Sequence, residues 1–336
     1  MDLNTLWFAL IAVLFMGFFF LEGFDYGVGM LLPFLGRKDD ERRAVINTIG
    51  PVWDGNEVWM ITAGGAIFAA FPHWYATLFS GFYLALFLIL VGLILRGVAF
   101  EFRSKVDRES WRNFWDWMLA LGSFVAALLW GAAIANLVRG VPIDAKMHAH
   151  VSFLALFNAY GLIGGLAAVL VFAFHGANFL ALKLPESLAP RAQRAGRALG
   201  GLAILFLALF ILAGAGYGLF ARPARALALL FATLAAVAAV GSLALRYKDA
   251  DAGAFWSLGL AILAGVAAVF AGLYPLVMPS TLNPAWSLTI YNAAASPYTL
   301  RVMTYVALIF TPLVLLYQGW TYWVFRGRVR MDTEGY

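Results

Sequence analysis

The sequence contains no cysteine and few charged residues. The absence of cysteine excludes disulfides, thiolate metal sites, iron–sulfur clusters and cysteine-linked haem. Only 12% of the 336 residues are charged and 63% are hydrophobic, whereas soluble domains carry about 25% charged residues. The composition therefore indicates an integral membrane protein. The net charge of +5 does not indicate a nucleic-acid-binding protein, because the charges cluster in short loops between apolar runs.

Apolar runs long enough to cross a membrane recur along the chain. A spanning helix needs about 20 mostly apolar residues. The charge-free run from Val58 to Leu95 is too long for one span, and Pro72 with the polar His73 predicts a tight turn that divides it. The start, MDLNTLWFAL, has no basic segment and no small-residue cleavage site, which favours a first helix over a signal peptide. The nine expected spans are residues 5–34, 52–71, 76–97, 115–138, 152–181, 199–220, 225–245, 254–275 and 301–325.

These spans predict an all-α membrane protein that forms one transmembrane domain over residues 1–336. A weak internal repeat is visible, because GFDYGVGML in the first helix resembles AFHGANFLAL in the fifth and aligns Asp25 with His175. The prolines of the segment before the last helix argue against another span there. We expect a first four-helix bundle at 5–138, a second at 152–275, an outer loop at 276–300 and a peripheral ninth helix at 301–325.

The placement of lysine and arginine predicts the orientation in the membrane. Of the 23 basic residues, 18 fall on one side of the expected spans and five on the other. Cytoplasmic loops carry the excess of Lys and Arg. The N-terminus is therefore expected outside the cell and the C-terminus in the cytoplasm.

Four carboxylates near the cytoplasmic ends of the first two helices are the candidate functional residues. Glu22 and Asp25 are three residues apart in the first helix, and Asp54 and Glu57 are three apart at the start of the second. Residues at this spacing share a helix face, and a short loop makes the two helices antiparallel neighbours. Carboxylates inside a membrane are costly and mark ion pathways. The pattern predicts a proton relay.

Two other interpretations of these carboxylates remain open. The carboxylates could reach the lipid headgroups, or they could pair with the basic residues of the loop after the first helix. Asp54 follows Gly-Pro at a helix start and could accept from free backbone N–H groups there. Arg96, at the inner end of the third helix, is the expected counter-charge, or else an ordinary interfacial anchor. The basic residues of the loop are Arg37, Arg42 and Arg43.

The histidines form a poor set of haem ligands. Bis-histidine ligation needs two facing imidazoles at matching depth. His73, His148 and His150 lie in outer turns and loops, and only His175 lies well inside a helix. His175 is therefore expected to be a buried core residue or a member of the proton path.

Several long motifs resemble subunit II of cytochrome bd-type quinol oxidases. They occur in order over the whole chain: GFFFLEGFDYGVGML, RRAVINTIGPVWDGNEVWMITAGGAIFAAFPHWYA, RGVAFEFRSK, WRNFWDW, YPLVMPSTLN and LLYQGWTYWVF. The resemblance implies a subunit of a quinol:oxygen oxidoreductase, which oxidises quinol, reduces oxygen to water and takes protons from the cytoplasm to generate a proton motive force.

The resemblance also implies cofactors, partners and location. Haem b and haem d are expected on the larger partner, subunit I, and not on this chain, and quinol is the substrate. A heterodimer with subunit I is expected in the cell membrane of a bacterium or archaeon, surrounded by lipid, with room for a small single-helix accessory subunit.

The acidic positions of the family correspond to Asp25 in GFDYG and Asp54 in WDGN, which the resemblance associates with proton delivery towards the oxygen-reducing haem of the partner. Glu57 stands where the family also uses glutamine. The expected proton path is Asp25, Asp54, Glu57 and Glu22, with no catalytic, cofactor-binding or metal-binding residue on this chain. The expected supporting residues are Trp53, Asn56, Arg96 and His175.

Two rival functions remain. A secondary transporter with a carboxylate proton site would also be built from two related bundles, and it would transport substrate without a partner. A purely structural subunit would use its acids only to cap helices and anchor loops, and neutralising them would spare turnover.

Overall fold

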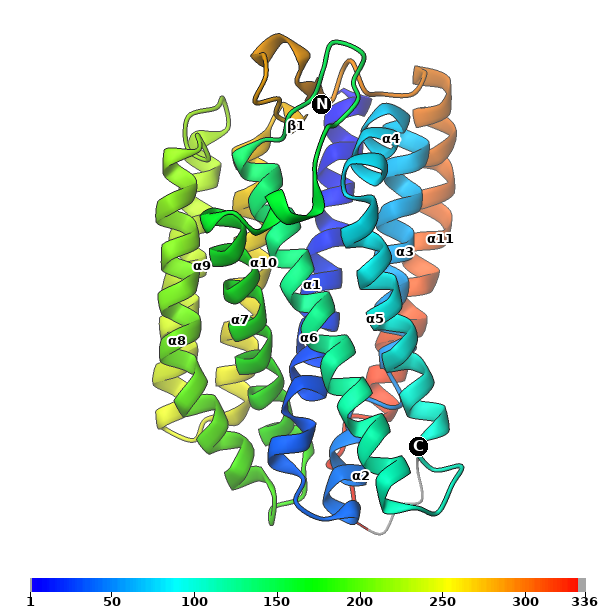
Figure 1. The fold of residues 1–336 in the computed structure, drawn as a ribbon, viewed down its shortest axis with the longest axis vertical. Coiled ribbons are helices and arrows are strands. Elements are labelled where there is room, and N and C mark those ends of the chain that lie inside the picture. Colours follow the sequence, from blue (N-terminus) through cyan, green and yellow to red (C-terminus); the bar gives the residue numbers. More distant parts are fainter. Residues whose placement is uncertain (1, 332–336) are drawn as a thin grey trace.

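The computed structural model describes residues 2–331, which form a long bundle of helices (Figure 1). The all-α fold class is confirmed. The helices are α1 (Leu3–Leu35), α2 (Asp39–Asn47), α3 (Trp53–Ala70), α4 (Pro72–Gly81), α5 (Tyr83–Phe102), α6 (Glu109–Arg139), α7 (Ala159–Lys183), α8 (Ala189–Gly216), α9 (Arg225–Tyr247), α10 (Asp251–Leu273) and α11 (Pro297–Val324). Short elements complete the chain: the 3-10 turns η1 (Phe153–Phe157) and η2 (Pro284–Trp286) and the strands β1 (Leu276–Met278) and β2 (Leu288–Thr289).

The expected count of nine spans is approximate. In the described residues, eight helices are long and apolar enough to cross a membrane: α1, α5, α6, α7, α8, α9, α10 and α11. The second expected span corresponds to α3, which has 18 residues and a length of about 27 Å. Its polar first turns, which contain Asp54, Asn56 and Glu57, lower its mean hydropathy. The expected turn after it lies at Phe71, and Pro72 opens α4, where its missing N–H is no loss.

Several helix ends differ from the apolar runs. The helices α6 and α8 begin at Glu109 and Ala189, ahead of the expected 115 and 199, because their first turns are polar and extend beyond the apolar core. The helix α7 begins at Ala159 and not at 152, because the side chain of Asn158 accepts a hydrogen bond from the backbone of Gly161 and caps the helix.

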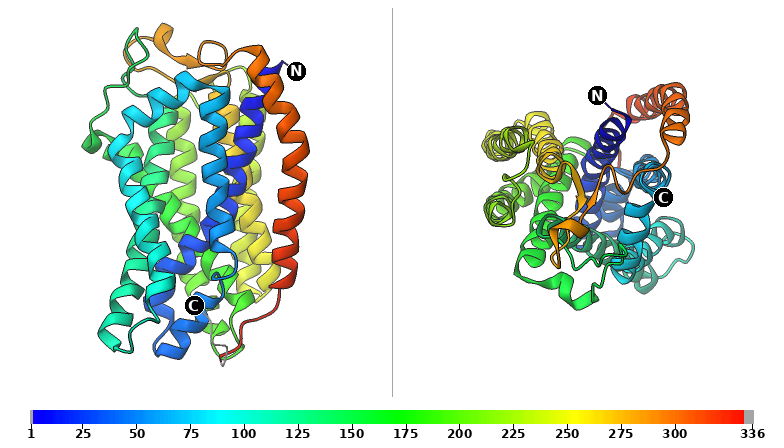
Figure 2. Two further views of the ribbon diagram at one scale, coloured as in Figure 1. Left: turned by 90° about the vertical axis from the view of Figure 1, so that its right-hand side faces the viewer. Right: turned by 90° about the horizontal axis from the view of Figure 1, so that it is seen from above.

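Helix α1 is the centre of the bundle and contacts α3, α6, α7 and α10. It crosses α7 at glycine: a Cβ on Gly27 would lie 1.9 Å from the carbonyl oxygen of Phe172, and one on Gly176 would lie 2.4 Å from the backbone of Gly27. Small residues let membrane helices approach this closely. Seen from above, α7 to α10 gather on one side of α1, α3 to α5 on the other, and α11 stands at the edge (Figure 2).

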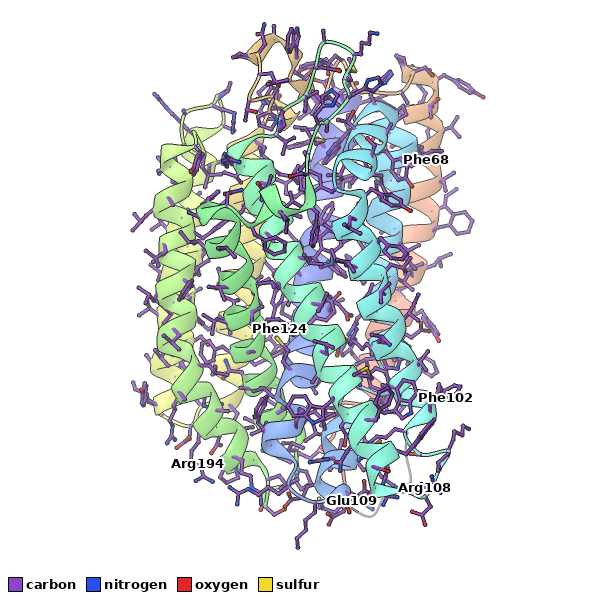
Figure 3. The ribbon with its side chains drawn as sticks, in the orientation of Figure 1. Phe68, Phe102, Arg108, Glu109, Phe124 and Arg194 are labelled. Carbon is purple, nitrogen blue, oxygen red and sulfur yellow. The ribbon has the colours of Figure 1, made fainter. Side chains whose placement is uncertain are left out.

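The two ends of the bundle differ in character. The end at which α1 begins carries the loops around β1 and β2, with Trp286 and Tyr291 exposed as expected for interfacial aromatics. The opposite end carries α2 and the charged loops, including Arg108, Glu109 and Arg194 (Figure 3). We call it the basic end.

Ion pairs hold the basic end together. Asp116 of α6 accepts from Nε of Arg103 at 2.6 Å and from Nη1 of Arg42 at 3.0 Å. Arg191 of α8 binds both oxygens of Glu41 of α2, and these hydrogen bonds lower the pKa of Glu41 to about 2. The charged ends of α2, α5, α6 and α8 are thereby joined below the apolar core.

The segment after α11 also lies at the basic end, against the end of α7. The backbone N–H of Val329 donates to the carbonyl oxygen of Lys183 at 2.8 Å, and Arg328 donates to the carbonyl oxygens of Ala181 and Leu184. Residues 332–336, on which the expected cytoplasmic C-terminus falls, lie outside the described residues.

Candidate functional site

A fully buried arginine gathers three of the four expected carboxylates. Nη1 of Arg96, on α5, donates to Oε1 of Glu22 and to Oε1 of Glu57, the latter at 2.7 Å. Its Nη2 lies 4.0 Å from Oδ2 of Asp25. The guanidinium carbon lies 5.1 Å from the ring centre of Tyr26. We call Glu22, Asp25, Glu57 and Arg96 the Arg96 cluster.

Three helices position this cluster near the basic end. Glu22 and Asp25 lie one turn apart on α1 and are both fully buried. Glu57 comes from the start of α3 and is 19% exposed at its side chain. Arg96 lies about two turns before α5 ends at Phe102. The expected pairing of Arg96 with the carboxylates is therefore present.

Trp53 holds the start of α3 against α5. Its ring stacks on Phe100 at 4.7 Å between centres. It also lies 3.4 Å from the position that a Cβ on Gly97 would take. Both contacts join Trp53 to α5. Trp53 therefore supports the site by packing and not through a hydrogen bond to the Arg96 cluster.

Asn56 connects Asp25 to the last helix. Its Nδ2 donates to Oδ2 of Asp25 at 2.6 Å, and its Oδ1 accepts from the hydroxyl of Tyr322 at 2.8 Å and from Nε2 of Gln318 at 3.4 Å. Asn56 is one of the expected supporting residues, whereas the sequence does not predict a role for Gln318 or Tyr322. Their spacing of four residues on a mostly apolar helix indicates a shared polar face but not the residue that this face contacts.

Asp54 lies outside the Arg96 cluster. It is in the first turn of α3 and is exposed, and the residue that faces Asp25 across the hairpin is Asn56. The expected cap is not formed, because Val52 is the N-cap residue and no side-chain cap bond is made. Asp54 is about one helical turn from Glu57 on the same helix. Because Asp54 is exposed, it links Glu57 of the cluster to the surface of the bundle beside α3.

The Arg96 cluster contains polar atoms that the described part of the chain leaves without a hydrogen-bond partner. They are Oε2 of Glu22, Oδ1 of Asp25, and Nε and Nη2 of Arg96, and the hydroxyl of the neighbouring Tyr26 also lacks a partner. Buried polar atoms are nearly always paired, and water is the usual partner when protein is not. These atoms are available to hydrogen-bond with water or with a protonated carboxyl group beside them.

The charges of the cluster do not balance if all its members are ionised. One guanidinium would then face three carboxylates in a site that is almost closed to solvent. Excess buried charge is expensive, and carboxyl groups that share a site hold protons to relieve it. The cluster can therefore store and exchange protons.

The second half of the bundle has a buried arginine without such a group of acids. Arg246 of α9 is fully buried, binds Asp251 at the start of α10 and lies 3.7 Å from a carboxylate oxygen of Asp249, which is 52% exposed at its side chain. Next to it, Nδ2 of Asn178 donates to the hydroxyl of Ser242 at 3.3 Å. Asp251 is 16% exposed at its side chain and also accepts from Gln193. This ion pair joins the end of α9 to the start of α10 at the basic end.

The histidines do not fit a haem site on this chain. Nε2 of His175 is 3.2 Å from the carbonyl oxygen of Phe20, and its ring stacks on Phe255 at 4.7 Å. His73, His148 and His150 are exposed, the last two beside Asp144. Within residues 2–331, no group of three or more His, Cys, Asp or Glu could hold a metal ion. These side chains offer no facing pair of axial ligands.

An apolar cavity of about 180 Å³ lies apart from the Arg96 cluster, with lining residues from both halves of the bundle. Phe15, Trp130, Gly164 and Val171 are among those residues, and none of the cluster residues is. Cavities of this kind stay dry. The Arg96 cluster is therefore the better candidate for proton chemistry.

Comparison with known proteins identifies close relatives of the whole chain. A family model described as cytochrome bd terminal oxidase subunit II matches residues 3–325. The chain is 42% identical over 329 residues to cytochrome bd ubiquinol oxidase subunit 2 of Bacillus subtilis (strain 168), which covers 98% of this chain and 97% of that protein. It is 39% identical over 368 residues to cytochrome bd-I ubiquinol oxidase subunit 2 of Escherichia coli (strain K12), covering 98% and 96%.

A solved structure shares the fold. A chain in the structure of bd oxidase from Geobacillus thermodenitrificans superimposes with a TM-score of 0.73 at 18% sequence identity. The match covers 95% of this chain and 99% of that chain. At this identity the likeness establishes the helical architecture.

Proposed function

The chain belongs to the subunit II family of cytochrome bd terminal oxidases, and we propose that it supplies part of the path by which protons reach the oxygen-reducing site of the complex. Family membership makes it a subunit of a quinol oxidase complex and a multi-pass membrane protein of bacteria. In the proposal, the protons come from the cytoplasm, and their uptake helps to generate a proton motive force.

The observation that carries the proposal is the Arg96 cluster. Three carboxylates share one guanidinium inside the bundle, and several of their polar atoms lack a protein partner. A carboxyl group that can both accept and release a proton, with water beside it, suits proton transfer. The excess of carboxylates over guanidinium groups, which an anchoring role does not require, is what favours proton exchange.

The exposed side of α3 is the proposed exit towards the partner. Asp54, Gly55, Ile61, Gly65 and Phe68 are exposed there, and a Cβ on either glycine would meet no atom within 4 Å. Small residues allow a second helix to pack closely, and an acid within a span is normally covered by protein or reaches water. A proton would pass from the Arg96 cluster through Glu57 to Asp54 and then to subunit I.

Subunit I is the proposed partner in a heterodimer and the proposed holder of haem b and haem d. Within residues 2–331, His175 contacts Phe20 and Phe255 and faces no second imidazole in these contacts, which supports this division. Quinol is the proposed electron donor and is oxidised by the partner. The surrounding lipid and a small single-helix accessory subunit would cover the remaining outer helices.

We predict the orientation as N-terminus outside and basic end in the cytoplasm. Cysteines introduced at Asp40 and Ser187, both exposed at the basic end, should resist an impermeant thiol reagent in intact cells. A cysteine at Ala285, exposed in the loop at the opposite end, should react. The native chain has no cysteine, so the unmodified protein is the background control. The reverse labelling pattern would place the carboxylates on the wrong side for uptake.

Replacing Asp54 with asparagine tests the proposed exit. Asn keeps the shape of the side chain but cannot exchange a proton, so oxygen consumption with quinol should fall roughly 10-fold per haem. Haem content should stay near that of the wild type, because Asp54 makes no bond that holds α3. Asp107→Asn is the control, since this carboxylate is 97% exposed in the loop before α6. Full turnover in Asp54→Asn would show that protons leave by another route.

A further inference from the structure

Helix α11 lies at the edge of the bundle (Figure 2), and most of its residues are not buried against it. Among its residues, Leu300 alone is buried, although α11 runs beside α1 and α3. Two sets of hydrogen bonds hold it. At one end, Nε1 of Trp7 donates to the carbonyl oxygen of Leu300 at 3.0 Å and to Thr304 at 3.1 Å. The second set lies about four turns further on, at Gln318 and Tyr322, beside the Arg96 cluster.

The second set of bonds leads directly to Asp25. Nε1 of Trp59 donates to Oε1 of Gln318 at 2.8 Å, which leaves the amide nitrogen of Gln318 facing Asn56. The hydroxyl of Tyr322 donates to the same oxygen of Asn56. The amide nitrogen of Asn56 then donates to Asp25.

This arrangement fixes the orientation of one buried amide. An asparagine side chain has one oxygen that accepts and one nitrogen that donates. Because two donors of α11 point at Oδ1 of Asn56, its Nδ2 is directed at Oδ2 of Asp25. Oδ1 of Asp25 has no partner among the described residues and lies with the other unpaired atoms of the cluster. One carboxylate oxygen is thus held by the amide, and the other is left for proton exchange.

We propose that Tyr322 and Gln318 are positioning residues that, through Asn56, hold the carboxyl group of Asp25 in the orientation needed for proton transfer. The proposal rests on the proposed function of Asp25. Hydrogen bonds between membrane helices also hold the helices together, so the proposal gives these bonds a second role beside holding α11 to the bundle.

The test uses the purified complex with Tyr322→Phe and Gln318→Leu combined. Both side chains keep much of their volume but lose their donors, so kcat for quinol oxidation should fall roughly fivefold to tenfold, with KM for quinol unchanged. Redox-induced infrared difference spectra supply the second measurement. The carboxyl band that disappears in Asp25→Asn should shift in the double variant.

Two further variants guard against a general packing defect. Tyr317→Phe changes the same helix at a side chain that is 68% exposed and should alter neither kcat nor the band. The single variant Tyr322→Phe retains the bond between Trp59 and Gln318, so it should stay folded and show a smaller shift of the same band.

The outcomes separate the two claims. If Asp25→Asn lowers turnover but the double variant keeps its kcat and its band, α11 does not position Asp25 and this inference is overturned, while the proposed function stands. If Asp25→Asn keeps full turnover, the proposed function fails and the positioning role fails with it, even where the band shifts. Loss of kcat with a shifted band, absent from Tyr317→Phe, supports the inference.

Discussion

Replacing Asp25 with asparagine is expected to lower oxygen consumption with quinol by roughly 100-fold per haem, a greater loss than at any other single carboxylate of this chain. Asp25 is fully buried between the amide of Asn56 and the guanidinium of Arg96. Asparagine has nearly the same shape, so the packing around it should persist. What it loses is the exchangeable proton. Turnover should be measured at saturating quinol on purified complex and divided by haem content.

Asp116→Asn is the matched control for this experiment. Asp116 is also a buried acid held by arginine, but it lies at the basic end, between Arg103 and Arg42. Its neutralisation should lower the stability of the complex while the turnover of each remaining haem stays unchanged. If Asp25→Asn behaves like Asp116→Asn, the carboxylates of this chain are structural and protons pass wholly through subunit I.

The pairing of Arg96 with the carboxylates of α1 could be predicted from the sequence, for simple physical reasons. Glu22 and Asp25 share a helix face, and an arginine at similar depth on a neighbouring helix is the natural counter-charge for acids inside a membrane. The long apolar runs likewise predict the all-α fold. Helix ends were less accurate, because polar first turns such as those of α6 and α8 carry no apolar signal.

The direction of Asp54 could not be predicted from spacing alone. Successive residues of an α-helix are about 100° apart around its axis. In the structure, Asn56 and Glu57 both face the Arg96 cluster, so the side of α3 that faces the cluster lies between these two residues. Asp54 points about 110° away from that side. The three-residue spacing of Asp54 and Glu57 is compatible with either residue facing inward. The rotation depends on tertiary contacts of α3, among them Asn56 with Asp25, Glu57 with Arg96 and Trp53 with Phe100.

The contacts of α11 are also invisible in the sequence. Gln318 and Tyr322 meet Asn56 across more than 260 residues of chain. The internal repeat, in contrast, is stronger than the sequence motif suggests. Arg96 follows Asp25 by the same number of residues as Arg246 follows His175, and both arginines are fully buried. This equal spacing supports the division into bundles at 5–138 and 152–275, which we propose as two diverged repeats.

The two arginines nevertheless should differ greatly in what their removal does. Arg96→Leu leaves Glu22, Asp25 and Glu57 without a counter-charge inside the bundle. Breaking a buried ion pair from one side destabilises by about 3–5 kcal/mol. We therefore expect the complex to accumulate poorly and to lose its haem spectrum at a clearly lower temperature than the wild type.

Arg246→Leu is the matched comparison, because this arginine is equally buried and stands at the corresponding place in the second half. Its partners Asp249 and Asp251 are 52% and 16% exposed at their side chains, and Asp251 also keeps the amide of Gln193, so both carboxylates can hydrate when the arginine is lost. Its loss should lower the melting temperature of the haem spectrum by less than half as much as that of Arg96. Adding Glu22→Gln and Glu57→Gln to Arg96→Leu should restore part of the stability, since fewer buried charges then lack a partner. Equal stability of Arg96→Leu and wild type would mean that the three carboxyl groups are neutral in the folded protein. In that case the guanidinium of Arg96 is not needed to offset the cost of burying these three carboxyl groups.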